Sequence, residues 1–286
     1  MEIIDTHAHV YSEDLARYPL MPDPYLPPPG TGTAAHLRRE MERNGVGRVV
    51  LVHTFTAYRW DNRLLADSTR ELGEAATGVC ALNPDDPASP DLLEDYFRNY
   101  GVRGLRVFPV GTGPEQTGPR SFELPGHHRL WESCARLGMV VCALIHAGEI
   151  ETLKGYLRRY PKLPVVLDHC ANLAAADAPD GENLHAVLSL AQFPNVFPKV
   201  TFVATGSKQP YPFGDTLPLA GRIIQEFGAG RCIWGSDFPT ELWIPNTDYA
   251  GHLRLFTEEL GLSAAEQAEL LGGTARHLWF PTLPAT

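Results

Sequence analysis

The sequence predicts an α/β fold in which eight parallel strands, each followed by a helix, close into a (β/α)8 or TIM barrel. Apolar runs of strand length alternate eight times with amphipathic helical stretches along the 286 residues. Strands that are apolar along their whole length are typical of a parallel sheet covered on both faces. Eight such units in a domain of about 250 residues match this barrel. We therefore expect one domain over residues 1–286.

The expected elements follow one another in a regular order. Strands are expected at residues 3–10, 46–55, 77–83, 102–109, 139–147, 165–170, 196–203 and 231–237. Helices are expected at 33–43, 61–73, 90–100, 127–137, 149–160, 183–192, 216–227 and 248–260, with two short helical pieces after them. Thr33 is a good N-cap for the first of these helices. An open doubly wound sheet is the alternative, but it needs a glycine-rich phosphate turn where this chain has His7 and His9.

Residues 11–32 form a long connection that carries six prolines. Connections of this length without secondary structure are usually functional or disordered. Because proline stiffens the backbone, we interpret this segment as a lid over a pocket. A plain surface excursion is the alternative.

Charge and cysteine usage restrict the possible partners. A formal net charge of -10, with arginines scattered along the chain, argues against nucleic acid or an anionic membrane as a partner. Five cysteines, an odd number without a Cys-x-x-Cys pair, indicate free thiols in a reducing compartment. No apolar run approaches the roughly 20 residues of a membrane span. We expect a cytoplasmic protein with a small-molecule substrate, and a homo-oligomer is compatible with this composition.

Ionisable side chains gather at the ends of the predicted strands, where catalytic groups of such barrels lie. The first strand ends in His7 and His9, which project to the same side because strand side chains alternate between faces. The others, at the ends of the second, fourth, fifth, sixth and eighth strands, are His53, Arg106, His146, His169 and Asp237. A structural barrel does not require so many, so the pattern predicts one site.

Four of these residues could hold a metal ion. His7, His9 and His146 offer imidazole nitrogens and Asp237 a carboxylate oxygen, the ligands of a catalytic zinc-type site with an open position for water. One divalent ion would acidify water and polarise a carbonyl, and the histidines alone are the metal-free alternative. Asp237 could take the proton from water and pass it to the leaving group. His169 could polarise the substrate or act as acid–base, or be a buried histidine bonded to a carbonyl.

Other residues are candidates for substrate binding. Arg106 suits a substrate carboxylate or lactone oxygen through bidentate hydrogen bonds, and a salt bridge that closes the barrel is the alternative. Tyr58 is a weaker candidate of the same kind. His53 could contact the substrate or be a structural histidine. Lys199, inside the seventh predicted strand, is interpreted as a buried partner of a carboxylate.

These residues together resemble the amidohydrolase superfamily, and within it the amidohydrolase-2 branch. The resemblance is carried by Asp5-x-His7-x-His9, His146, His169 and the segment 234–239, and it extends to segments 58–62, 101–106 and 272–276. It implies a barrel enzyme related to sugar and pyrone-dicarboxylate lactonases and to decarboxylases. Two-metal members carry a carboxylated lysine at the end of the fourth strand, where this chain has Arg103 and Arg106. The resemblance therefore implies one ion or, as in some lactonases of this branch, none.

Three functions are compatible with these residues. The leading hypothesis is a hydrolase that opens a lactone bearing hydroxyls or carboxylates by attack of water, with Asp237 as the base. The alternative is a metal-dependent non-oxidative decarboxylase that uses the same site. A catalytically silent barrel used for binding is the third, and it predicts that replacing Asp237 leaves the function intact.

Overall fold

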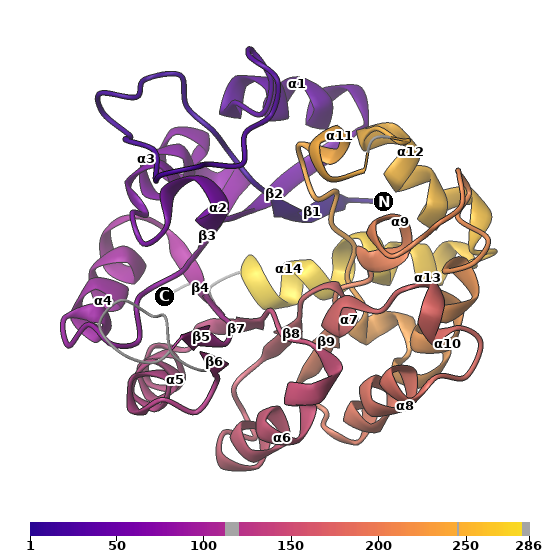
Figure 1. The fold of residues 1–286 in the computed structure, drawn as a ribbon. Helices are drawn as coiled ribbons and strands as arrows, with labels where there is room; N and C mark the ends of the chain where they lie inside the picture. The colour runs from indigo at the N-terminus through magenta and orange to yellow at the C-terminus, as the bar shows by residue number, and fades with distance from the viewer. Residues whose placement is uncertain (112–119, 245, 282–286) are drawn as a thin grey trace.

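The structure, a computed structural model, describes residues 1–111, 120–244 and 246–281 and has the predicted barrel architecture (Figure 1). One sheet of seven strands has the order β1 (Ile3–Ala8), β2 (Val46–Val52), β3 (Ala76–Cys80), β4 (Val102–Val107), β7 (Val140–Ala143), β8 (Val165–Leu167) and β9 (Val196–Pro198). All neighbouring strands in it are parallel, as their continuous apolar character predicts. A short antiparallel pair, β5 (Val110–Gly111) with β6 (Arg120–Ser121), follows β4 in the chain.

The predicted eighth strand closes this sheet through isolated bridges rather than as a regular strand. Ile233 pairs with Lys199 just beyond β9, and Phe238 pairs with Ala8 at the end of β1. Both bridges are parallel, so the sheet returns to its first strand. The barrel prediction is confirmed, with an eighth strand less regular than the range 231–237 suggested.

Gly235 allows this closing segment to approach β1. A Cβ on Gly235 would stand 2.6 Å from the Cβ of His7 and 2.8 Å from the His7 backbone nitrogen. Non-bonded carbon atoms do not come that close, so a larger residue would push the segment away from His7. The glycine therefore sets the distance between His7 and Asp237, which follows two residues later.

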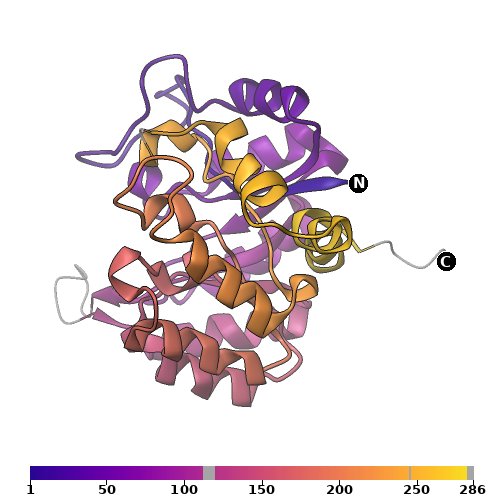
Figure 2. The ribbon, with the colours of Figure 1, turned by 90° about the vertical axis from the view of Figure 1, so that its right-hand side faces the viewer.

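Helices surround the barrel, and the last of them lies across one of its ends (Figure 1, Figure 2). They are α1 (Ala34–Arg43), α2 (Phe55–Tyr58), α3 (Arg63–Leu72), α4 (Ser89–Asn99), α5 (Pro125–Leu137), α6 (Ile150–Arg159), α7 (His169–Asn172), α8 (Glu182–Leu188), α9 (Phe202–Thr205), α10 (Leu217–Phe227), α11 (Thr240–Trp243), α12 (Tyr249–Arg254), α13 (Ala264–Ala268) and α14 (Thr274–Trp279). Thr33 caps α1 as predicted, because its side chain accepts the His36 N–H. No helix in the described part of the chain combines the length and apolar character needed to cross a bilayer.

The interior of the barrel is apolar at the end where α14 lies. Trp279 of α14 is 2% exposed and belongs to the same cluster as the inward side chains Val79, Val140, Val166 and Ile233. Gly104 on β4 makes room for it, since a Cβ there would stand 2.7 Å from the Trp279 ring. This end of the barrel is therefore filled by side chains.

Charged residues occupy the next inward positions, because side chains alternate along a strand with period 2. Each charged residue lies two positions after an inward residue of a strand. The pairs are Gly104 and Arg106, Val166 and Asp168, and Phe197 and Lys199. Arg106, Asp168 and Lys199 are all buried. They form a charged layer between the apolar interior and the carboxyl ends of the strands.

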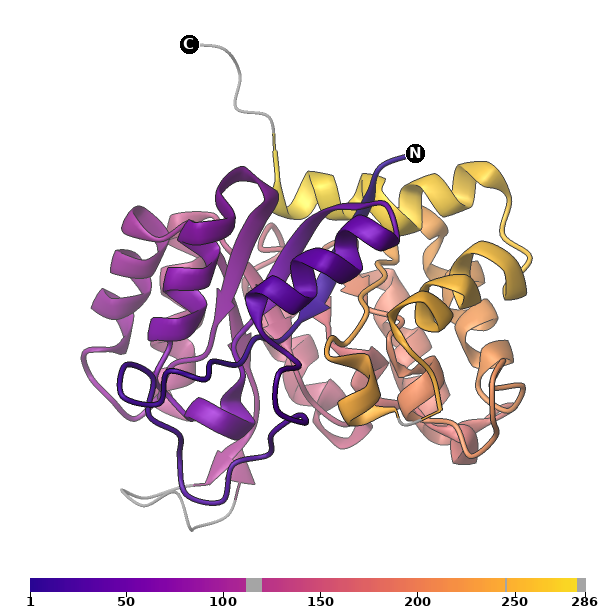
Figure 3. The same cartoon turned by 90° about the horizontal axis from the view of Figure 1, so that it is seen from above.

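Residues 11–32 lie at the end of the barrel opposite α14 (Figure 3). The Met21 N–H donates to Ala57 O at 2.8 Å and the Tyr25 N–H to Thr56 O at 3.1 Å, which fastens the segment to α2. The Tyr25 ring lies 5.1 Å from the ring of Trp243 at the end of α11. The segment is therefore bonded to the rim of the barrel, and its movement as a lid stays a prediction.

Candidate active site

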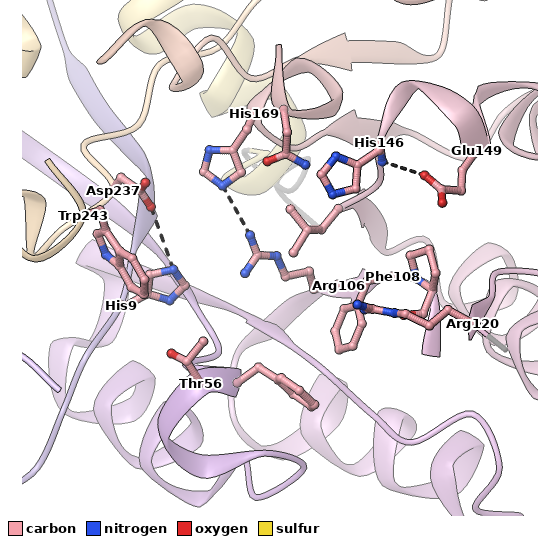
Figure 4. A pocket seen from close by; sticks show the side chains of 14 residues that line it. His9, Thr56, Arg106, Phe108, Arg120, His146, Glu149, His169, Asp237 and Trp243 are labelled. Atoms are coloured by element: carbon pink, nitrogen blue, oxygen red, sulfur yellow. Dashed lines mark hydrogen bonds and ion pairs between the residues drawn. The ribbon is translucent and has the colours of Figure 1, made fainter. Parts of the chain in front are cut away.

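A cavity of about 460 Å³ opens at the carboxyl ends of the strands (Figure 4). Aromatic and ionisable side chains make up most of its wall. It is lined by His9, Phe55, Thr56, Arg106, Phe108, Pro109, Arg120, Leu144, His146, Glu149, His169, Asn172, Asp237 and Trp243. A cavity that combines apolar wall residues with convergent polar groups, at this position of a barrel, is typical of a small-molecule site.

His7, His9 and Asp237 converge at one side of this cavity. Their nitrogen and oxygen atoms lie within 4.8 Å of one another, and all three residues are buried. His7 Nε2 is 3.2 Å from His9 Nε2 and 3.4 Å from Asp237 Oδ1. His9 Nε2 is 3.9 Å from the same carboxylate oxygen. The first strand and the closing segment thus bring three of the predicted residues together, and we call them the trio.

Asp5, one layer below, fastens the closing segment to β1. Its carboxylate accepts hydrogen bonds from Ser236 Oγ at 2.6 Å, from the Ser236 N–H at 2.9 Å and from the Tyr249 hydroxyl at 2.9 Å. It also accepts the His7 N–H at 3.0 Å. Asp237 follows with a left-handed φ of 57°, the kind of backbone strain that accumulates at functional sites. Asp5 therefore holds both halves of the trio in place.

The Asp237 carboxyl lies where it can exchange protons near neutral pH. Burial raises its pKa to about 7, although Arg106 and Lys199 act in the opposite direction. A carboxyl group with such a pKa can both accept and return a proton at pH 7. This property fits the base predicted at the end of the eighth strand.

Arg106, Asp168 and Lys199 form a buried chain of ion pairs beneath the cavity. Arg106 Nε donates to Asp168 Oδ2 at 2.9 Å, and Lys199 Nζ lies 2.8 Å from Asp168 Oδ1. Burial alone would raise the pKa of Asp168, but the Lys199 ammonium and the Arg106 guanidinium outweigh it and hold the pKa below its ordinary value. Lys199 is thus the buried carboxylate partner that the sequence suggested. Arg106 forms the salt bridge that was the alternative expectation for it and also lines the cavity, and its contact to a substrate stays a prediction.

His169 begins a left-handed turn directly after β8. Residues 169–172 have φ angles of 51°, 47°, 58° and 58°, a conformation that costs a non-glycine residue about 1–2 kcal/mol. The turn places His169 Nδ1 2.6 Å from Thr201 Oγ1 and Nε2 3.4 Å from Arg106 Nη2. Because a guanidinium only donates, Nε2 accepts and the ring proton is on Nδ1. Burial lowers the pKa of His169 to about 3, so the ring is neutral.

The trio offers two imidazole nitrogens and a carboxylate oxygen, a donor set that zinc takes. His9 Nδ1 lies 2.9 Å from Val52 O. A carbonyl oxygen only accepts, so Nδ1 carries the proton and Nε2 presents its lone pair to the trio. His7 Nδ1 instead lies 3.0 Å from Lys199 Nζ. The donor set therefore fits a divalent ion. If His7 bound that ion through Nε2, its ring proton would have to be on Nδ1, and Lys199 lies at that nitrogen.

His146 lines the same cavity but stands apart from the trio. It is solvent-exposed, and among the described residues the potential ligand atoms that cluster belong to His7, His9 and Asp237. Figure 4 shows His146 on the other side of Arg106, beside Glu149, whose carboxylate accepts the His146 N–H at 2.8 Å. This arrangement does not bring His146 to the other predicted ligands, and its role as a ligand stays a prediction.

Tyr58 and His53 are not among the residues that line the cavity, and the substrate contacts suggested for them stay a prediction. Val50 and Val52 of β2 face the barrel interior, so His53 faces outward by alternation. His53 Nε2 donates to Arg59 O at 2.6 Å. The Tyr58 hydroxyl accepts the N–H of residue 12 at 2.9 Å. Neither lines the cavity as described, and both instead stabilise the loops after β1 and β2.

The sequence reasoning did not single out Asp168 as the centre of the ion pairs or the aromatic walls. The inward positions of β8 could have identified Asp168, since Val166 and Asp168 share one face. Phe55, Phe108 and Trp243 line the cavity from outside the regular strands. Phe108 lies in the expected strand 102–109 on the face of Arg106, so the same signal could have identified it. Trp243 lies outside every expected strand, and no comparable signal was present for it.

A closed α/β barrel with a buried His-His-Asp trio at its strand ends is typical of barrel hydrolases, whose active site lies at the carboxyl ends of the strands. Comparison with known proteins agrees, because the family model described as Amidohydrolase matches residues 4–280. The chain therefore belongs to the amidohydrolase family and is an enzyme of the hydrolase kind. The resemblance inferred from the sequence is confirmed.

Two characterised relatives cover most of the chain. It is 26% identical over 246 residues to the L-fucono-1,5-lactonase of Burkholderia ambifaria, covering 84% of this chain and 82% of that protein. It is 25% identical over 269 residues to the D-galactarolactone isomerase of Agrobacterium fabrum, covering 93% and 86%. Both relatives are named for lactones.

Solved structures share the fold. A putative 2-pyrone-4,6-dicarboxylic acid hydrolase from Pseudomonas putida is similar with a TM-score of 0.77 and 26% identity, covering 97% of each chain. An amidohydrolase from Burkholderia multivorans with bound zinc has a TM-score of 0.76 and 22% identity, covering 98% of this chain and 99% of the other. A Rhizobium 2,6-dihydroxybenzoate decarboxylase has a TM-score of 0.69 and 14% identity over 98% of each chain. At 22% and 14% identity, the similarity to the last two structures concerns the fold alone.

Proposed function

We propose that this enzyme hydrolyses a lactone by attack of water on the ring carbonyl. The observation that carries the proposal is the Asp237 carboxyl, which has a pKa of about 7 and lies 3.4 Å from His7 Nε2 at the edge of the cavity. The lactone names of two relatives support the same substrate class. A general base at this position accounts for hydrolysis without a covalent intermediate.

Asp237 is the proposed base and, afterwards, the acid. As the water oxygen bonds to the carbonyl carbon, one water proton passes to Asp237. The bond from that carbon to the ring oxygen then breaks, and Asp237 returns the proton to the ring oxygen. The product is the open hydroxy acid, and Asp237 ends in its starting state.

Arg106 and His169 are proposed to act on the substrate from the opposite side. The Arg106 guanidinium lines the cavity while Asp168 fixes its Nε, so it can stabilise negative charge that develops on the carbonyl oxygen. The neutral His169 ring accepts from Arg106 through its Nε2 lone pair and so holds the guanidinium in place at the cavity wall. His169 thus orients groups without carrying a charge.

A divalent ion, with zinc as the first choice, is proposed to fit between His7 Nε2, His9 Nε2 and the Asp237 carboxylate. When bound it would polarise a carbonyl and lower the pKa of water. The zinc in one solved neighbour and the donor set of the trio support this ion. The proton transfers described for Asp237 do not depend on it.

The proposed substrate is a small lactone that carries hydroxyls or a carboxylate. Arg106 and Arg120 offer charged donors to the cavity, while Glu149 offers a carboxylate that suits hydroxyl groups. A cavity of about 460 Å³ suits a small molecule. Five buried, unpaired cysteines fit a reducing compartment, so we place the reaction in the cytoplasm.

A panel of lactones, followed with a pH indicator, tests the proposal. Sugar lactones and carboxylated lactones should release acid at a rate proportional to enzyme, and the Asp237→Asn variant should not. Release of carbon dioxide from aromatic or enol acids, without lactone opening, would instead favour the decarboxylase alternative. A silent barrel would bind a ligand and turn over neither class.

A further inference from the structure

Lys199 is a completely buried lysine that touches the trio. Its ammonium lies 3.0 Å from His7 Nδ1 and 2.8 Å from Asp168 Oδ1, and its side chain is 0% exposed. Asp168 is itself held by Arg106, whose Nε donates to the other carboxylate oxygen at 2.9 Å. The position of the Lys199 charge is therefore fixed from two sides.

The direction of the hydrogen bonds around the trio follows from which groups can only donate or only accept. A lysine ammonium has donors and no acceptor, so His7 Nδ1 accepts from Lys199 and the His7 proton is on Nε2. His9 has its proton on Nδ1, because Val52 O accepts there at 2.9 Å. His7 Nε2–H can therefore donate to His9 Nε2, which lies 3.2 Å away. Lys199, His7, His9 and Val52 form one consistent chain of hydrogen bonds.

This chain places a proton where a metal ion would need a lone pair. We propose that Lys199 is a positioning residue that keeps His7 in its Nε2–H form and thereby weakens metal binding at the trio. An ion can bind His7 Nε2 only after the His7 proton has left that nitrogen, and Lys199 occupies the place of the other tautomer's proton. The proposal refines the metal part of the function proposed above and rests on it.

The charges that face the trio act in the same direction. Lys199 and Arg106 are two cations, Asp168 is paired with both of them, and Asp237 adds at most one further negative charge. A divalent ion beside these four groups would add two buried positive charges that they cannot neutralise. Uncompensated buried charge is unfavourable. Loss of the Lys199 ammonium would remove both the fixed tautomer and part of this repulsion.

The tautomer of His7 can be measured directly in the wild-type protein. Protein labelled with nitrogen-15 in histidine, stripped of metal by a chelator, gives imidazole spectra that distinguish protonated from unprotonated ring nitrogens. The His7 signals are those lost in the His7→Gln variant. We expect Nε2 protonated and Nδ1 unprotonated for His7, and the opposite pattern for His9. A proton on His7 Nδ1 would overturn the proposal.

Zinc affinity provides the second measurement, through competition with a chromogenic chelator. Lys199→Met should bind Zn²⁺ more tightly than the wild type, by about 10- to 100-fold, the range over which groups bonded to metal ligands usually change affinity. The exposed Lys162→Met is the matched control and should bind as the wild type does. Affinity in Lys199→Met equal to or weaker than that of the wild type would overturn the proposal.

A folding control keeps this test decisive. Lys199→Met leaves Asp168 with a single cationic partner, and the double variant Lys199→Met/Asp168→Asn removes both charges of the pair. If the single variant does not fold, the double variant carries the affinity test with the same expected gain, and Asp168→Asn alone serves as its reference. Neither the spectra nor the zinc titration measures turnover, so failure of the lactone assay and failure of this inference are distinguishable.

Discussion

On the β1 side of the site, two neutral imidazoles are held by hydrogen bonds, His9 by Val52 O and His7 by Lys199. On the β4, β8 and β9 side, Arg106, Asp168 and Lys199 hold one another through ion pairs. The first side keeps lone pairs and a proton-exchanging carboxyl available for chemistry. The second supplies fixed charges whose cost of burial is offset within the group. Reactivity and positioning are thus divided between two sides of one barrel.

The largest effect is expected on the reactive side. Asp237→Asn cannot accept a proton, so kcat for lactone opening should fall by about 10²- to 10⁴-fold, the usual contribution of general acid–base catalysis, with a smaller change in KM. Steady-state kinetics would measure this. The exposed Asp180→Asn is the control. A folded Asp237→Asn enzyme with wild-type kcat would show that the base lies elsewhere.

The next effect concerns stability and compares the two sides. Asp168→Ala leaves Lys199 and Arg106 without their buried anion and should lower the free energy of unfolding by about 3–5 kcal/mol. Asp5→Asn, beneath the trio, keeps an acceptor and should cost about 1–3 kcal/mol. Urea denaturation of both variants tests the order. Equal losses of free energy of unfolding in Asp168→Ala and Asp5→Asn would contradict a special role of ion pairs on the side of Asp168.

Acid should destabilise the two sides at different pH. Burial lowers the pKa of His53 to about 4 and of His9 to about 3, below the roughly 6.5 of an unfolded histidine. Their contribution is therefore complete above about pH 6.5 and is lost as the pH falls toward 4. The pKa of Asp168 lies below its ordinary value, so its contribution persists until the pH falls below about 4.

Denaturation of the metal-free protein at a series of pH values would separate these two stages. His53→Gln keeps a donor for Arg59 O but does not titrate. Its free energy of unfolding should therefore fall less steeply between pH 6.5 and about 4, while the loss below about pH 4 remains. An unchanged slope in His53→Gln would show that buried neutral imidazoles do not set the first stage.

The smallest effect is expected at His146. It is exposed and apart from the trio, so His146→Gln should change zinc affinity by less than about threefold, within the range of a surface substitution. Zinc titration with His9→Gln as the positive control measures this. A loss in His146→Gln as large as that in His9→Gln would make His146 a ligand after all.

The fold was predictable from the sequence because apolar continuity reports burial on both faces of a strand. Six of the seven strands lie within the expected ranges, β3 begins one residue before its range, and all seven end earlier than expected. The eighth is irregular because Gly235, Ser236 and Asp237 serve the site, through close approach, hydrogen bonding to Asp5 and proton exchange. A pattern of apolar residues cannot report those tasks.

The site was predictable where a residue lies on a regular strand. Alternation from Gly104 places Arg106 correctly, whereas β1 is irregular between Asp5 and Ala8, so alternation from the inward Ile4 would have turned His7 outward. Alternation also ends where the strand ends. β7 stops at Ala143, three residues before His146, so the facing of His146 could not be read from the strand. His53 shows the opposite case, since the parity of β2 already turns it outward. The ion pairs of Asp168 needed knowledge of which strands are neighbours across the barrel.

Trp279 fills one end of the barrel and leaves the strand-end cavity as the route between the trio and solvent. Through the described part of the chain, substrate, attacking water and the released acid can all use this cavity mouth as a doorway, and a product that remains in it blocks the next substrate. A group placed at that doorway, such as Tyr25 against Trp243, can set the pace of a cycle without touching the bond that breaks.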